Sequence, residues 1–226
     1  MKSRLAPQLL VLLVAGSLAF SQEAKDNSSE KSVKPFVNKK YFKNYNPAGV
    51  DDCQRYRNQV MEALSLKPGM VVADVGAGGG FFVREFSPLV APNGKVYAVD
   101  IVPSFIEYIK KQAADKGLTN IECVLGNDKS VCLPPESADI IFSSQTYHHF
   151  EYPKNMLASI RKALRPNGEL VMVDHRKKDG ITPPPDCRLG REEVIEEVTA
   201  AGFEKKAEYD TIPGMYFIRF GKKAEK

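Results

Sequence analysis

The chain has 226 residues, of which 43% are hydrophobic and 27% charged, and its formal net charge is +4. This length and composition are ordinary for one globular domain with additional segments. Lys2 and Arg4 supply two of the positive charges from a segment that we expect to be removed. The remaining charge is therefore too small to indicate nucleic-acid binding by itself.

Residues 1–21 predict a secretory signal peptide. Their basic start is followed by a short uncharged apolar run, Leu9–Phe20, and Ala19-Phe20-Ser21 offers small residues for cleavage before Gln22. The run is too short to span a bilayer comfortably, and an uncleaved membrane anchor is the alternative. Both alternatives place the folded part outside the cytoplasm, either periplasmic or secreted, and anchored to the membrane if the signal is not cleaved.

Residues 22–40 are rich in Lys, Ser, Glu and Asn and poor in apolar side chains. They cannot bury enough surface to repay the entropy of ordering, so we expect a disordered linker. The folded domain is then expected over residues 41–226. Its first residues, 41–50, include aromatics that can form a flap, and Asp51 or Asp52 can cap a helix that runs to about Leu64.

The domain is organised around residues 71–82. Four apolar residues and one acid, Val71–Val75, lead into four glycines within Gly76–Gly80, and an apolar run follows. This pattern predicts a buried parallel strand, a tight turn and the start of a helix. Because glycine has no Cβ, the backbone of such a turn can pass close beneath a ligand, and its N–H groups favour a polar or anionic group.

Strands and helices alternate from this point. The expected strands are Met70–Val75, Lys95–Asp100, Ile121–Leu125, Ala138–Ser143 and Glu169–Asp174, and the expected helices run from near Gly80 to Pro88, from about Ser104 to Lys116 and from about Lys154 to Leu164. A Pro-rich loop, 181–189, then precedes a helix at Arg191–Ala201 and two strands at Lys205–Thr211 and Met215–Phe220.

The short link between the last two strands predicts a hairpin, so one of them runs antiparallel to its partner. The expected fold class is α/β: a doubly wound, mostly parallel, seven-stranded Rossmann-like sheet with an antiparallel C-terminal hairpin. Ligands of such sheets bind at the carboxyl ends of the strands, beside the point where the strand order reverses. The residues at these ends are therefore the candidate site.

Two cofactor interpretations compete for the glycine turn. The dinucleotide fingerprint requires a third glycine where this chain has Phe81. The pattern present is acid-x-Gly-x-Gly-x-Gly, formed by Asp74, Gly76, Gly78 and Gly80. A strand–helix turn without a ligand is the structural alternative.

The next two strand ends supply polar groups that suit a nucleoside. Asp100 can accept hydrogen bonds from two ribose hydroxyls, or it can simply cap the following helix. Ile101 can lie against a flat base. Asn127 or Asp128 can accept a hydrogen bond from an adenine amino group, and the alternative for both is an ordinary turn.

The fourth strand leads into Tyr147-His148-His149, which would face the reaction centre. Tyr147 or His148 can act as a base or orient a substrate, while one of the two histidines packs structurally. A metal site is not predicted, since Asp174, His175 and Cys187 are the only further ligands nearby. The four cysteines lack a C-x-x-C pair, so a disulfide and unpaired thiols both stay open.

Residues from about 50 to 220 resemble the class I S-adenosylmethionine (SAM)-dependent methyltransferases, and the small UbiE-like enzymes in particular. The resemblance rests on the order and spacing of these stretches: Leu66-Lys67-Pro68-Gly69, Asp74–Gly80, Val96–Asp100, Leu133-Pro134, Ser137-Ala138-Asp139, Tyr147–Phe150 and Leu164–Leu170.

The resemblance implies that Gly76, Gly78 and Gly80 approach the methionine part of SAM, with Asp74 beneath them. It also implies that Asp100 holds the ribose hydroxyls and that Asn127 or Asp128 meets the adenine.

The resulting expectation is an enzyme that transfers the methyl group of SAM to a small-molecule acceptor. The fourth-strand loop lacks the Asn/Asp-Pro-Pro-aromatic motif associated with methylation of nucleic-acid bases, so base methylation is disfavoured. The alternatives are an exported SAM- or nucleoside-binding protein without turnover and an NAD-dependent oxidoreductase. The acceptor atom, the oligomeric state and the source of SAM outside the cytoplasm are not predicted.

Overall fold

A computed structural model describes residues 52–176 and 189–224. The predicted signal peptide, linker and aromatic flap, and residues 181–188 of the Pro-rich loop, lie outside the described residues. The elements are η2 (Asp52–Tyr56), α2 (Arg57–Leu64), β1 (Val71–Val75), α3 (Phe81–Val90), β2 (Lys95–Asp100), α4 (Pro103–Asp115), β3 (Ile121–Leu125), β4 (Ala138–Ser144), η3 (Tyr147–His149), α5 (Pro153–Ala163), β5 (Leu164–His175), α6 (Arg191–Ala200), β6 (Phe203–Tyr209) and β7 (Met215–Lys222).

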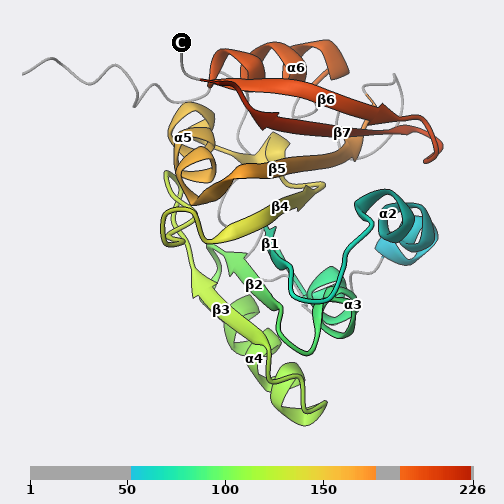
Figure 1. Ribbon diagram of the computed structural model, residues 1–226, viewed down its shortest axis with the longest axis vertical. Coiled ribbons are helices and arrows are strands. Elements are labelled where there is room, and N and C mark those ends of the chain that lie inside the picture. The colour runs from blue at the N-terminus through green and yellow to red at the C-terminus, as the bar shows by residue number, and fades with distance from the viewer. Residues whose placement is uncertain (1–51, 177–188, 225–226) are drawn as a thin grey trace, which may run out of the picture.

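The strands form one seven-stranded sheet in the order β3-β2-β1-β4-β5-β7-β6 (Figure 1). Strands β1 to β5 pair in parallel, and β7 runs antiparallel to both β5 and β6. The order reverses between β1 and β4, which places the switch point of the sheet at these two strands. The predicted fold class, including the C-terminal hairpin, is confirmed.

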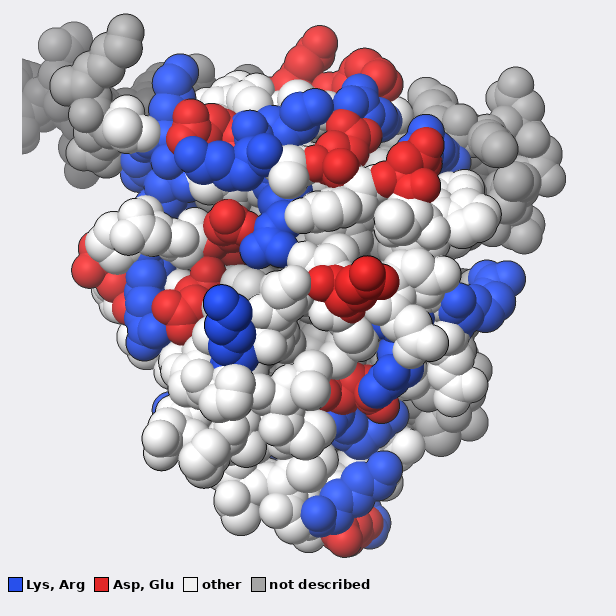
Figure 2. Space-filling model, turned by 45° about the vertical axis from the view of Figure 1, so that its right-hand side comes forward, with Lys and Arg blue, Asp and Glu red and all other residues white. Residues whose placement is uncertain are grey.

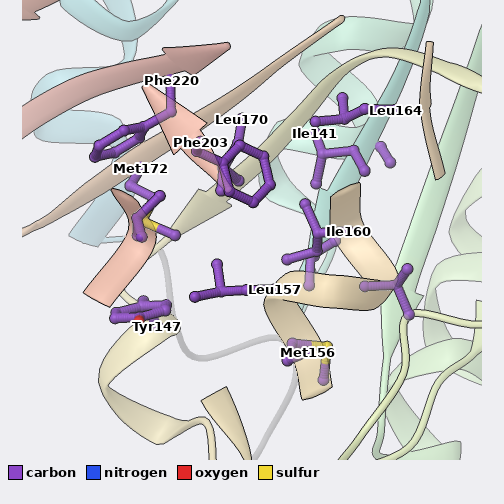
Figure 3. Close-up of a cluster of buried hydrophobic side chains, with 14 of the residues drawn as sticks. Ile141, Tyr147, Met156, Leu157, Ile160, Leu164, Leu170, Met172, Phe203 and Phe220 are labelled. Carbon is purple, nitrogen blue, oxygen red and sulfur yellow. The ribbon is translucent and has the colours of Figure 1, made fainter. Parts of the chain in front are cut away.

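Two apolar cores cover the two faces of the sheet. One core joins α2, α3 and α4 to the sheet through side chains such as Val60, Phe86 and Ile109. The other joins α5 and α6 to it, and Figure 3 shows its packing around Leu157 and Ile160. Because β1 and β2 are buried on both faces, their sequences are almost continuous apolar runs, which is why their positions could be predicted.

Several element ends differ from the prediction, and those of α3 and β5 have a visible cause. Helix α3 continues past Pro88 to Val90, whose carbonyl accepts hydrogen bonds from Gly69 N (2.9 Å) and Gly94 N (2.8 Å). Strand β5 begins at Leu164 rather than Glu169. Its first residue pairs with Ala138, and the register shifts before Ile140, so Pro166-Asn167-Gly168, a sequence typical of a turn, lies within the strand as an irregularity.

The outer strand of the hairpin is strongly charged. Glu204, Lys205 and Lys206 are all exposed on β6, which is a common protection of a sheet edge against pairing with another chain. On the face drawn in Figure 2, Lys and Arg side chains lie interspersed with Asp and Glu rather than in one basic field.

The described ranges contain three of the four cysteines. No disulfide joins Cys53, Cys123 and Cys132 there, and Cys187 lies outside them. Over residues 52–176 and 189–224, none of the helices has both the length and the apolar character needed to cross a bilayer.

Candidate active site

The carboxyl ends of β1, β2, β4 and β5 meet at one edge of the sheet. The glycine turn follows β1, and two hydrogen bonds fix it to the neighbouring strand: Gly76 N and Ala77 N donate to Val99 O at 2.8 and 3.1 Å. Gly76, Gly78 and Gly80 have φ angles of 78°, 51° and 73°, so all three occupy the left-handed region that favours glycine. The turn conformation therefore depends on these residues before any ligand is considered.

The surroundings of two of these glycines differ. A Cβ on Gly76 would lie 2.2 Å from Cγ2 of Thr146, in the loop after β4, so glycine is required there for close packing between the two loops. A Cβ on Gly78 would have no neighbouring atom within 4 Å. The backbone at Gly78 thus borders open space at the edge of the sheet, where a ligand can approach it.

Asp100 braces the same turn from the end of β2. Its two carboxylate oxygens accept hydrogen bonds from Gly78 N and Val102 N, each at 2.9 Å, and the residue is only 7% exposed. Burial raises the pKa of Asp100, and the backbone donors oppose that rise. Each oxygen has a second lone pair, so the carboxylate can still accept hydrogen bonds from a ligand.

Asp74 lies at the end of β1 and is 3% exposed. Burial, together with the negative charge of Asp100, raises the pKa of Asp74 to about 8. The group is therefore mainly a neutral carboxylic acid at pH 7. A buried acid of this kind at the base of an open turn is suited to pairing with a cationic ligand group, whose arrival would favour its ionised form.

The residues expected near a base lie farther along the same edge. Ile101 is 38% exposed after β2, as a residue that contacts a flat ring would be. Asn127 is exposed, and its side-chain oxygen accepts a hydrogen bond from Lys129 N at 2.9 Å, which forms a local turn. Asp128 is half-buried beside it. The structure places both residues at the end of β3, and which of them meets a ligand stays a prediction.

The structure argues against Tyr147 as a base. Its side chain is 3% exposed and packs in the core beneath α5 and α6, among residues such as Leu157 (Figure 3). Its hydroxyl donates a hydrogen bond to Glu197 of α6 at 2.8 Å. Burial and the charge of Glu197 raise the pKa of Tyr147 well above its ordinary value, so the phenol does not readily ionise to accept a proton.

His148 lies against the tip of β5. Its Nδ1 is 2.7 Å from Oδ2 of Asp174, and both side chains are 4% exposed. The neighbouring His149 ring lies 4.0 Å from the His148 ring, centroid to centroid. Burial, reinforced by His148, lowers the pKa of His149 to about 3, so His149 is neutral at physiological pH. The Asp174 carboxylate orients the His148 ring. The role of His148 as a base stays a prediction.

A second polar chain at this edge was not predicted. The side-chain amide of Gln145 donates to the Tyr56 hydroxyl at 2.6 Å, and its oxygen lies 2.8 Å from Nε2 of His175. Tyr56 also lies 3.1 Å from the hydroxyl of Ser144. These residues come from η2, β4, the loop after β4 and β5. The sequence placed His175 at a strand end, where it was considered as a metal ligand, and its contact with Gln145 was not predicted.

Comparisons with known proteins agree with this geometry. Residues 66–213 match a family model described as a methyltransferase domain. A solved SAM-dependent methyltransferase from Aquifex aeolicus is 27% identical, with a TM-score of 0.71 over 78% of this chain and 98% of that one. The class defined by the fold and site is therefore that of the class I SAM-dependent methyltransferases.

Curated relatives point the same way. Nocamycin O-methyltransferase from Saccharothrix syringae is 26% identical over 144 residues, covering 64% of this chain and 49% of the relative. The C-methyltransferase UbiE from Hahella chejuensis is 28% identical over 123 residues, covering 54% and 49%. The chain spans about half the length of the curated relatives it matches. This chain belongs to the methyltransferase-domain family, as its sequence predicted.

Family membership implies SAM as the cofactor, and the residues present fit it. The open backbone at Gly78 gives access to an extended ligand, Asp74 supplies a buried carboxyl for the ammonium group, and Asp100 keeps acceptor capacity for hydroxyls. Ile101 adds an exposed apolar surface at the adjacent strand end. For residues 52–176 and 189–224, no group of three or more His, Cys, Asp or Glu side chains is placed to hold a metal ion.

Proposed function

We propose that this protein transfers the methyl group of SAM to a small-molecule acceptor. The observation that carries the proposal is the combination of the Gly76–Gly80 turn with Asp100, whose carboxylate accepts a hydrogen bond from Gly78 N at 2.9 Å. That carboxylate fixes the shape of the turn and keeps lone pairs for a sugar. The family match supports the proposal independently.

The bound cofactor would supply an activated methyl group, so the protein has a modest chemical task. The glycine turn and Asp100 would hold the ligand, and the buried Asp74 would offer a carboxyl to its ammonium group. The loop after β4 closes against the turn through Thr146 and Gly76, whose carbonyl lies 3.5 Å from the Thr146 hydroxyl. The remaining task of the protein would be to place the acceptor in line with the methyl group.

Binding can be tested by calorimetric titration of the purified protein with S-adenosylhomocysteine and with NAD. We expect S-adenosylhomocysteine to bind and NAD not to bind, and the reverse result would contradict the proposal. Asp100→Ala removes the acceptor for two backbone N–H groups as well as for the ribose, so it also disturbs the turn. Asp100→Asn keeps the shape and one acceptor oxygen, and we expect it to weaken binding at least tenfold with the fold retained.

A nucleoside-binding protein without turnover is the second candidate, because it would use the same turn. Transfer of labelled methyl groups to a mixed panel of phenols, amines and thiols distinguishes the two candidates. Binding without transfer to any member would favour the second. The acceptor is expected to be a small molecule rather than a nucleic acid, in line with the mixed charges of Figure 2.

Export of the protein is a separate proposal. It is supported only by the sequence of residues 1–21, with its basic start and short apolar run. Mass spectrometry of the N-terminus after cell fractionation tests it: we expect the mature chain to begin at Gln22 and to leave the cytoplasm. An intact Met1 in the cytoplasmic fraction would contradict it.

A further inference from the structure

The side chain of Thr146 connects the loop after β4 to the cofactor turn after β1. Its hydroxyl donates a hydrogen bond to Ser144 O, the carbonyl of the last β4 residue, at 2.9 Å. The same hydroxyl lies 3.5 Å from Gly76 O, which is the long limit of a hydrogen bond. Its methyl group fills the space above Gly76, where a Cβ would lie 2.2 Å away. Thr146 therefore lies at the switch point of the sheet, where the ends of β1 and β4 meet.

The direction of the Thr146 hydroxyl is not the one that its backbone position favours. Thr146 is the residue before η3, and its carbonyl accepts a hydrogen bond from His149 N at 2.8 Å. A threonine at the start of a helical turn commonly uses its hydroxyl to accept a backbone N–H of that turn. The Thr146 side chain makes no such capping hydrogen bond. Its hydroxyl is turned instead toward the two carbonyls at the cofactor turn.

The three oxygen atoms that meet here can accept more hydrogen bonds than they can donate. Ser144 O and Gly76 O are carbonyl oxygens and only accept, whereas the Thr146 hydroxyl has a single hydrogen. That hydrogen points to Ser144 O, the nearer of the two carbonyls. The hydroxyl oxygen keeps its own lone pairs, and each carbonyl oxygen has two. A ligand group with several N–H hydrogens would complement this set.

The charges beside these oxygens favour a cation over an anion. Asp74 lies two residues before Gly76, and Asp100 ends the neighbouring strand, and both carboxyl groups are buried. A primary ammonium group carries three hydrogens and a positive charge, so it suits both the oxygens and the acids. A carboxylate would be repelled by the same groups. The amino-acid end of SAM carries one ammonium and one carboxylate, and the ammonium is the one that fits beside Thr146.

We propose that Thr146 determines the selectivity of the cofactor site for nucleosides that carry an amino group on the chain attached to sulfur, an assignment that rests on the proposed function. The hydroxyl oxygen of Thr146 accepts a hydrogen bond from that ammonium group and keeps its own hydrogen on Ser144 O. A nucleoside without the amino-acid end gains nothing from this contact. Thr146 is thus a binding residue of the cofactor site, additional to the glycine turn and its two acids.

Calorimetric titration with two related ligands tests the assignment without turnover. S-adenosylhomocysteine and 5′-methylthioadenosine share the nucleoside and the sulfur, but only the first has the amino-acid end. Thr146→Val keeps the shape of the side chain and its packing on Gly76 while it removes the hydroxyl. It should weaken S-adenosylhomocysteine binding about fivefold or more and change methylthioadenosine binding by less than about twofold. Weak nucleoside binding is measured by displacement of S-adenosylhomocysteine.

Further variants separate the hydroxyl from other effects. Thr146→Ser keeps the hydroxyl and should restore S-adenosylhomocysteine affinity to within about twofold of wild type, and Thr146→Ala, as a second variant without it, should repeat the selective loss. Thr199→Val on α6 is the matched control, because the Thr199 hydroxyl also donates to a backbone carbonyl, Ile195 O, at 2.7 Å. It should leave both affinities unchanged. Circular dichroism and urea denaturation check that each variant is folded.

A third ligand identifies which part of the amino-acid end meets Thr146. The 3-aminopropyl thioether of adenosine keeps the amine of S-adenosylhomocysteine but lacks its carboxylate. Thr146→Val should weaken binding of this amine as it weakens binding of S-adenosylhomocysteine. A loss confined to the ligand with the carboxylate would show that the hydroxyl contacts that group instead, and it would overturn the proposal.

The other outcomes separate this inference from the function it rests on. Equal weakening of S-adenosylhomocysteine and methylthioadenosine by Thr146→Val would mean that the hydroxyl only shapes the turn. Unchanged or tighter S-adenosylhomocysteine binding would mean that the hydroxyl is not a ligand or that it competes with one. Each of these results would overturn the inference alone. Failure of the wild-type protein to bind S-adenosylhomocysteine would contradict the proposed function itself, and the assignment of Thr146 with it.

Discussion

Asp74→Asn should make the cofactor-free protein more stable while it weakens cofactor binding. Asp74 is 3% exposed, and burial beside Asp100 raises its pKa from 3.8 to about 8. Ionising this group in the folded protein is therefore unfavourable. Asparagine has nearly the same shape as the protonated acid but does not ionise, so it avoids that cost. It also cannot provide the negative charge that a cationic ligand group requires.

The sign of the effect follows from proton binding. Between about pH 4 and pH 8 the unfolded chain has released the proton of Asp74 and the folded protein has kept it. The free energy of unfolding of the wild type consequently falls by about 1.4 kcal/mol per pH unit from this group. Below pH 4 both states are protonated, and above pH 8 both are ionised. The stability gained by Asp74→Asn should therefore grow with pH and level off above pH 8.

Urea denaturation of wild type and variant at pH 5, 6.5 and 8 measures this gain. We expect the difference in unfolding free energy to increase by roughly 4 kcal/mol from pH 5 to pH 8. Taking the difference at each pH cancels the titration of groups that do not interact with Asp74, such as His149. Asp115→Asn, at an exposed position on α4, is the matched control and should show a difference that does not depend on pH. A flat difference for Asp74→Asn, or one that shrinks with pH, would refute the reasoning.

The remaining predictions concern the glycine turn and the loop after β4. Gly76→Ala should destabilise the protein by about 3 kcal/mol or more, because it combines a left-handed φ with a clash against Thr146. Gly78→Ala should cost only about 1–2 kcal/mol of unfolding free energy and mainly weaken S-adenosylhomocysteine binding. Equal losses of stability in urea denaturation would contradict this distinction. The pKa of about 3 at His149 lies below the ordinary value, so its contribution to stability is present above about pH 6.5 and is lost as the pH falls toward 3. His149→Phe should therefore flatten the acid side of the stability curve, and an unchanged slope would argue against a buried neutral imidazole. Tyr147→Phe should cost about 1 kcal/mol in unfolding free energy and leave kcat within twofold, and a large loss of kcat with normal stability would restore Tyr147 as a catalytic candidate.

The sheet was predictable because its central strands are short apolar runs between strong turn residues. Strands β2 and β3 begin and end where the sequence placed them, at Lys95–Asp100 and Ile121–Leu125. The errors arose where tertiary pairing overrides local signals. Pro166 begins no new turn, because Leu164 already pairs with β4. Pro88 does not end α3, whose last carbonyl, at Val90, accepts hydrogen bonds from Gly69 N and Gly94 N.

The parts of the candidate site that could be predicted are those whose residues lie close together in the sequence. The glycine turn can be identified because its pattern is contiguous, and Asp100 because it ends a recognisable strand. The direction of Tyr147 could not be predicted, since successive residues of a 3-10 turn such as η3 point to different sides. The partners of Gln145 were also hidden, because His175 is 30 residues away and Tyr56 is 89 residues away. Parallel pairing of β4 with β5 brings Gln145 to His175, whereas Tyr56 comes from η2.

The tip of β4 connects the two halves of the site. Three consecutive residues diverge there: Ser144 toward Tyr56, Gln145 toward His175, and Thr146 against Gly76 of the cofactor turn. Parallel pairing of β4 with both β1 and β5 sets the position of Ser144, and Gln145 and Thr146 follow it directly, so the sheet determines how close the contacts of Gln145 lie to the cofactor turn. A substitution that shifts this strand end should therefore disturb the cofactor turn and the contacts of Gln145 together.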